Sequence, residues 1–145
     1  MKVHQLSLFV ENRPGQLTIP CKALADAGIN ILTLSLADTQ QFGIMRLIVE
    51  KWEAAAEILE RAGFVVNVTE VVAVEIEDKP GGLAAILEVL EKSNVNIEYM
   101  YAFTGRRGDK AILVFRFDDP DVAIKRLAEA GTNPLASVSL FHQEA

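Results

Sequence analysis

One short motif occurs twice in the same register. Residues 11–17 read ENRPGQL and residues 77–83 read EDKPGGL, an offset of 66 residues from Pro14 to Pro80. The same offset carries Leu24 onto Leu90 and keeps the hydrophobic alternation of the preceding strand in phase. In a chain of 145 residues, such a repeat predicts two small tandem domains, one over residues 1–69 and one over residues 70–145.

Domains this small bury only part of their apolar surface when they fold alone. We therefore expect the two domains, or two copies of the chain, to dock, and we expect a homodimer.

The charge balance limits the classes of partner. The formal net charge is −6, and the only basic cluster, Arg106 and Arg107, falls in an expected turn. Nucleic acid is not an expected partner, because binding to a phosphate backbone draws on clustered lysine and arginine. The sequence also lacks an apolar run of about 20 residues and a signal-peptide pattern, so we expect no membrane contact and a cytoplasmic location.

Cofactor, redox and metal chemistry are not expected. Cys21 is the single cysteine, so it has no partner within the chain for a disulfide or a metal site, and it lies on an apolar helix stripe. We interpret it as a packing residue.

Hydrophobic periodicity places the elements of the first copy. We expect strands at residues 3–10, 31–37, 44–50 and 64–68, a first helix with Leu17, Cys21 and Leu24 on its apolar stripe and Gly28 at its end, and a second helix at residues 52–62.

The second copy repeats this order. We expect strands at residues 72–76, 97–103, 111–117 and 137–142, a helix lined by Leu83, Ile86, Leu87 and Leu90, a polar turn at residues 104–110, and a last helix capped by Asp118 or Asp119 and ended by Gly131. Two extra residues are placed just before the last helix, and residues 69–70 are expected to link the copies.

This order predicts an α+β fold of two tandem ferredoxin-like βαββαβ units, with antiparallel sheets and helices on one face. The fold hosts unrelated functions, so the function has to come from its sites.

The motif ENRPGQL followed by AGINI, repeated as EDKPGGL followed by SNVNI, resembles the ACT domain, the amino-acid-sensing module of biosynthetic enzymes such as aspartokinase. The resemblance covers nearly the whole chain and is greatest for stand-alone proteins of two tandem ACT domains. It implies a non-catalytic regulatory protein that binds an amino acid or similar small metabolite at interfaces between ACT domains.

The resemblance also implies the ligand-binding positions, which are the first loop after each first strand and the start of each second strand. They are Asn12, Pro14, Gly15, Gln16, Leu17, Asn30 and Ile31 in the first copy, and Asp78, Gly81, Gly82, Leu83, Asn96 and Ile97 in the second.

Backbone amides at a helix N-terminus favour a carboxylate, and we expect residues 15–16 or 81–82 to supply them. The Asn12 side-chain amide can serve both ends of a zwitterion, whereas an ionised Asp78 only accepts hydrogen bonds. The two sites should therefore differ.

Structural explanations stay open for these residues. The glycines could serve only the turn, Asn12 and Asp78 could be helix N-caps, and Asn30 and Asn96 could simply end the preceding helices.

Other functions are less well supported. The sequence lacks the pattern of an RNA-recognition domain and the paired cysteines of a metal chaperone. An acylphosphatase-like enzyme would need an arginine-bearing phosphate loop after the first strand, where Arg13 and Lys79 are the only basic residues and no partnered nucleophile or base is evident. The alternative function that remains is a ligand-free assembly module that pairs with a partner protein through its sheet edges.

Overall fold

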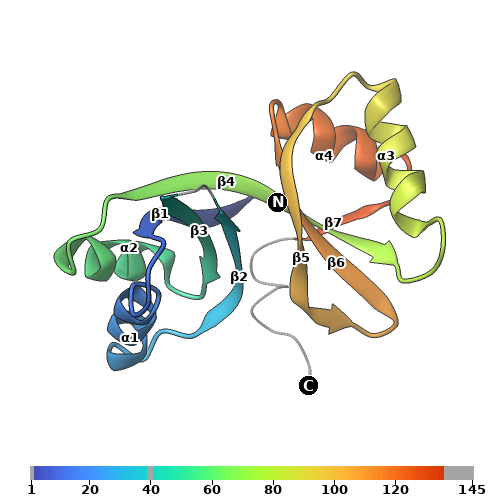
Figure 1. Ribbon diagram of the computed structural model, residues 1–145. Helices are drawn as coiled ribbons and strands as arrows, with labels where there is room; N and C mark the ends of the chain where they lie inside the picture. The colour runs from blue at the N-terminus through green and yellow to red at the C-terminus, as the bar shows by residue number, and fades with distance from the viewer. Residues whose placement is uncertain (1, 39–40, 136–145) are drawn as a thin grey trace. The chain divides into compact units, whose positions relative to one another are not determined.

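The computed structural model describes residues 2–38 and 41–135 (Figure 1). In chain order its elements are β1 (Val3–Glu11), α1 (Thr18–Asp26), β2 (Ile31–Asp38), β3 (Phe42–Val49), α2 (Trp52–Arg61), β4 (Val66–Glu77), α3 (Gly82–Lys92), β5 (Ile97–Arg107), β6 (Lys110–Phe117), α4 (Pro120–Glu129) and β7 (Asn133–Leu135). The expected α+β fold of two tandem ferredoxin-like units is confirmed.

The described residues form two compact units. One is His4–Thr69, and the other holds the remaining described residues. Strand β4 is continuous across the boundary, so its first part belongs to one unit and its second part to the other. The expectation that residues 69–70 form a link between two strands is wrong. Alternating β-branched residues continue through this segment and keep it extended.

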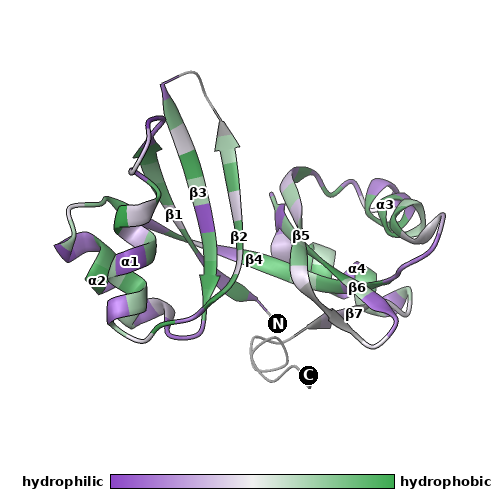
Figure 2. Ribbon diagram, turned by 60° about the horizontal axis from the view of Figure 1, so that its bottom comes forward, coloured by the Kyte–Doolittle hydropathy of each residue, from purple (hydrophilic) through white to green (hydrophobic). Residues whose placement is uncertain are grey.

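In the unit His4–Thr69, the strand order is β2-β3-β1-β4, with β1 and β2 both antiparallel to β3. Leucine and valine side chains at alternate positions of β1 and β3 pack with Leu24 of α1 and with Ala55 and Leu59 of α2. Both helices therefore cover one face of the sheet. In Figure 2, α2 shows the hydrophobic and hydrophilic sides that this packing requires.

In the other unit, β4 pairs with both β6 and β7, and β5 pairs with β6, all antiparallel. Val72, Phe115 and Phe117 pack with the inner faces of α3 and α4. The rings of Phe115 and Phe117 are stacked with centroids 5.3 Å apart. The arrangement repeats that of the first unit, as the offset between the two motifs predicts.

Several expected boundaries need correction. Residues 104–107 and Lys110 belong to β5 and β6 rather than to a polar turn, and the ladder between these strands shifts register between Ala102 and Arg106. The extra residues of the second copy lie in this hairpin, not before α4. Leu6 in β1 pairs with Leu47 in β3, and its equivalent Val72 in β4 pairs with Phe115 in β6. The offset between the copies is therefore 66 residues at the first pair (72 minus 6) but 68 at the second (115 minus 47). The two extra residues precede α4 by at least the length of β6.

Two helix positions were also misassigned. Leu17 and Leu87 are 42% and 36% exposed, so neither lies on the buried stripe of its helix. Leu17 precedes the first residue of α1, where the helical periodicity does not yet apply. The strand expected at residues 137–142 lies outside the described residues, and the strand described next to β4 is β7.

Candidate functional site

The two repeated loops share one turn, which their Pro-Gly pairs form, although α3 begins directly after it at Gly82 and α1 begins two residues later, at Thr18. The N–H of Gln16 donates to the carbonyl of Arg13 at 3.3 Å, and that of Gly82 donates to the carbonyl of Lys79 at 3.0 Å. Gly15 and Gly81 have φ of 87° and 88°. Proline followed by a residue with positive φ, closed by this hydrogen bond, is a type II β-turn. The turn role of the two glycines is therefore established.

This geometry changes which amides are available to a ligand. The N–H groups of Gln16 and Gly82 were expected to be free, but both are used inside the turn. The N-cap residues are Leu17 for α1 and Gly81 for α3, and neither supplies a side-chain cap. Asn12 and Asp78 therefore do not occupy the N-cap positions, and that structural explanation is wrong.

Each loop carries an ion pair at its start. Glu11 pairs with Arg13 at 2.8 Å and Glu77 with Lys79 at 2.5 Å. The hydrogen bond from Lys79, followed by the charges of Lys79 and Lys110, holds the pKa of Glu77 below its ordinary value. The same hydrogen bond raises the pKa of Lys79. Each loop thus presents an acceptor and a cationic donor side by side, the two groups that a zwitterion requires.

A hollow of about 190 Å³ lies against the first loop. It is lined by Val10, Glu11, Asn12, Arg13, Leu17, Leu36 and Gly43. The backbone N–H of Asn12 donates to the carbonyl of Gln41 at 3.0 Å, which ties the loop to the hairpin of β2 and β3. The strand end, the loop and the hairpin thus form the three walls of this hollow.

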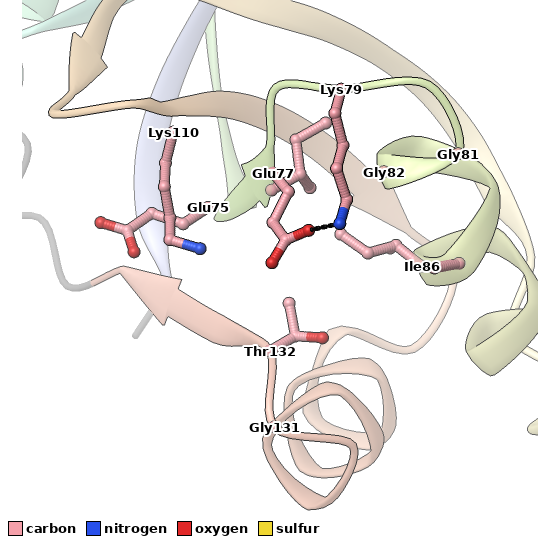
Figure 3. Close-up of a pocket in the computed structure, with 11 residues that line it drawn as sticks. Glu75, Glu77, Lys79, Gly81, Gly82, Ile86, Lys110, Gly131 and Thr132 are labelled. Carbon is pink, nitrogen blue, oxygen red and sulfur yellow. Dashed lines mark ion pairs between the residues drawn. The ribbon is translucent and has the colours of Figure 1, made fainter.

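A larger hollow, of about 470 Å³, lies against the second loop (Figure 3). Its walls come from the end of β4, the start of α3, the start of β6 and the segment between α4 and β7. Four charged side chains line it, Glu75, Glu77, Lys79 and Lys110, whereas Glu11 and Arg13 are the two that line the first hollow. Glu77 faces Lys110 across the ladder between β4 and β6. The two hollows therefore differ both in chemistry and in the elements that form them.

The starts of the second strands are less available than expected. The backbone N–H of Asn96 donates to Oδ1 of Asp118 at 3.0 Å, and its carbonyl accepts from the N–H of Asp118 at 3.2 Å. Both backbone groups of Asn96, which was expected to complete the second pocket together with Ile97, are thus engaged. Asn30 and Asn96 are exposed, and Ile31 and Ile97 are half-buried.

The structure brings only part of the expected set together. Asn12 and Leu17 line the first hollow, and Gly81 and Gly82 line the second. The expected residues that line neither of these two hollows are Pro14, Gly15, Gln16, Asn30, Ile31, Asp78, Leu83, Asn96 and Ile97.

Sequence reasoning missed Leu36, Gly43, Lys110 and Thr132, which line the two hollows. These residues are far from the loops in the sequence. Strand pairing brings them close, and no local sequence signal indicates which residues will pair.

Other residues considered for chemistry have packing roles. The His4 ring stacks on Trp52 with centroids 4.3 Å apart. Cys21 packs against the core, and burial raises the pKa of its thiol. Within residues 2–38 and 41–135 no group of three side chains is placed to hold a metal ion. In the same ranges no helix has the length and apolar character to cross a membrane.

A family model described as "ACT domain pair" matches residues 1–136. The chain belongs to the ACT domain pair family. The two turns, ion pairs and hollows described above are therefore features of an ACT domain pair. Among curated proteins, none matches the sequence.

Solved structures agree on the fold. A crystal structure of a protein from Bacteroides thetaiotaomicron is 37% identical, with a TM-score of 0.91, and the match covers 98% of this chain and 97% of that chain. The ligand-free regulatory subunit of aspartate kinase from Thermus thermophilus is 18% identical, with a TM-score of 0.64 and coverage of 88% and 91%. The regulatory subunit from Thermus flavus is 17% identical, with a TM-score of 0.60 and coverage of 90% and 94%.

Proposed function

We propose that this ACT domain pair is a cytoplasmic, non-catalytic regulatory protein that binds an amino acid or a similar small metabolite. The observation that carries the proposal is the repeated loop, in which a type II turn holds a carboxylate and a cation 2.8 Å apart in one copy and 2.5 Å apart in the other, beside an open hollow. The resemblance to ACT domains implies amino-acid binding at this loop, and a regulatory subunit of aspartate kinase shares the fold.

The first loop has the better groups for a zwitterion. Asn12 offers an amide that both donates and accepts, Arg13 offers a cation, and Glu11 offers an acceptor for an ammonium group. All three side chains are exposed, so a ligand can reach them. In the second copy, Asp78 replaces the amide with an acid.

Binding would act by selecting one arrangement of the domains. A ligand shifts such an equilibrium only by its difference in affinity for the two arrangements. A ligand at an interface between ACT domains would contact both domains in only one arrangement, so its affinity would differ between the two arrangements. We propose that the protein works as a homodimer and that a partner protein reads the ligand-bound arrangement.

Thermal unfolding against the twenty amino acids tests the proposal. A compound at about 100 times its dissociation constant adds about 2.7 kcal/mol, which raises the Tm by several degrees. Asn12→Ala and Asp78→Ala identify the working loop, and Asn67→Ala, an exposed asparagine on β4, is the matched control. Loss of stabilisation in Asn12→Ala or Asp78→Ala but not in Asn67→Ala supports the proposal. No stabilisation by any compound contradicts it.

A ligand-free assembly module is the second candidate, and one observation favours it. Strand β2 is an edge of the sheet, and Leu34 and Leu36 on it are 46% and 48% exposed. Exposed apolar edge strands pair readily with other strands. Light scattering of the wild type and of Leu34→Lys tests this candidate. A stable wild-type dimer that no amino acid stabilises, together with dissociation of the dimer by Leu34→Lys, would favour the assembly function over ligand binding.

A further inference from the structure

The hollow beside the first loop has a wall of leucine side chains that packing leaves open. Leu17 is 42% exposed and Leu36 is 48% exposed, although both are large and apolar. Val10 also lines the hollow and is 2% exposed. Apolar surface of this kind favours a ligand that removes it from water.

The end of the Leu36 side chain lies over Gly43. A methyl group at Gly43 would lie 2.8 Å from Cδ1 of Leu36, which is closer than side-chain carbons pack. Glycine at this point of β3 therefore leaves room for the leucine against the sheet. The hollow that results holds the volume of about six water molecules, which suits an amino acid rather than a nucleotide or a peptide.

The second copy lacks this wall. In the first copy, Met45 pairs with Leu8 on one side and with Leu36 on the other. In the second copy, Leu113 pairs with Val74 and with Ala102 in the same way. Leu36 and Ala102 therefore occupy equivalent positions. Likewise Gly43 faces Val10, and Ala111 faces Ile76. The leucine and glycine pair of the first copy is an alanine pair in the second.

We propose that the first loop selects an amino acid with an aliphatic side chain, and that Leu17 and Leu36 determine this specificity. The inference rests on the proposed function. The ammonium and carboxylate of the ligand meet Glu11, Asn12 and Arg13, and its side chain lies on the two leucines. A charged side chain in this place would lose water without gaining a partner, because it would lie on two leucines while Glu11, Asn12 and Arg13 bind the ammonium and carboxylate of the ligand.

Titration calorimetry of the full chain with glycine, alanine, valine, leucine, aspartate and lysine tests the specificity. We expect leucine or valine to bind at least about ten times more tightly than glycine, and aspartate and lysine to show no heat of binding. Leu36→Ala introduces the residue of the second copy and should remove most of the preference for leucine over glycine. Leu17→Ala tests the other leucine independently.

Val68→Ala is the matched control, since Val68 is an aliphatic residue on β4 that is similarly exposed, at 44%, but does not line the hollow. Its affinity for leucine should equal that of the wild type. Binding of aspartate or lysine as tight as that of leucine overturns the specificity while amino-acid binding stands. The same holds if Leu36→Ala and Leu17→Ala both keep the wild-type preference, or if Val68→Ala loses it equally. If no amino acid in the panel binds, the specificity falls, and the proposed function falls as well only if none of the twenty amino acids stabilises the protein against thermal unfolding.

Discussion

Asp118 and Asn96 are joined by two hydrogen bonds, one from the Asn96 N–H to the Asp118 carboxylate at 3.0 Å and one from the Asp118 N–H to the Asn96 carbonyl at 3.2 Å. The same Oδ1 also accepts from the N–H of Asp119 at 2.9 Å. This carboxylate ties the start of β5 to the end of β6, and its neighbour Asp119 caps α4 by accepting from Val122.

Asp118→Ala should therefore lower the free energy of unfolding by about 1 kcal/mol, because backbone donors at both Asn96 and Asp119 lose an acceptor. Asp118→Asn keeps a side-chain oxygen acceptor and should cost less. Urea denaturation of the three proteins measures the difference. Equal stability of Asp118→Ala and the wild type would show that water replaces the carboxylate at no cost.

Gly82→Ala should destabilise the protein by about 1–3 kcal/mol or more, because the added methyl group would lie 2.1 Å from the carbonyl oxygen of Glu77. Glu77 and the start of α3 would have to separate. Gln16 stands at the equivalent place in the first loop, so Gln16→Ala is the matched control and should be nearly neutral. Thermal unfolding of both variants checks the contrast. A neutral Gly82→Ala would mean that the loop relaxes freely.

Glu77 should titrate below its ordinary pKa of 4.5, because Lys79 donates a hydrogen bond to it and Lys110 adds a second positive charge. Since the folded-state pKa is depressed, its stabilising effect is present above the unfolded pKa and is lost as the pH falls through the folded pKa. NMR titration of the Glu77 carboxyl carbon gives the value directly.

In Lys79→Met the pKa of Glu77 should rise toward 4.5, and in Lys110→Met it should rise less, since Lys110 acts only through its charge. An unchanged pKa in Lys79→Met would mean that the ion pair does not persist in solution.

Asn94 ends α3 with φ of 54°, whereas Gly28, Gly63 and Gly131 stand with positive φ after α1, α2 and α4. Left-handed backbone is costly for a residue with a Cβ, and asparagine tolerates it better than most. Asn94→Ala should cost about 1 kcal/mol, and Asn94→Gly should be neutral or slightly stabilising. Chemical denaturation separates these outcomes, and a more stable Asn94→Ala would contradict this account.

Much of the fold could be predicted because its signals are local. The alternation of Leu6, Leu8 and Val10 predicts one buried face of β1, and these side chains are at most 2% exposed. Gly28 and Gly131 marked helix ends, and Pro with Gly in each loop marked a turn. The predicted boundaries were wrong where local sequence and strand pairing disagree. Residues 104–107 are polar and typical of a turn, but they belong to β5, which pairs with β6 as far as Arg107.

The site was less predictable. The motif indicated Asn12 and Leu17, but the partners of these residues in the hollow, Leu36 and Gly43, come from β2 and β3. Asn96 looked available in the sequence, and only the position of Asp118 shows that its backbone is engaged.

The sequence by itself determined the repeat, the order of elements, the Pro-Gly turns and the family, because each depends on residues close together in the chain or on a fixed offset. Tertiary structure decided which side chains meet. Strand register set the opposition of Glu77 and Lys110, the fit of Leu36 over Gly43 and the place of the extra residues. Register is a property of paired strands distant in sequence, where a shift of one residue turns every side chain to the other face.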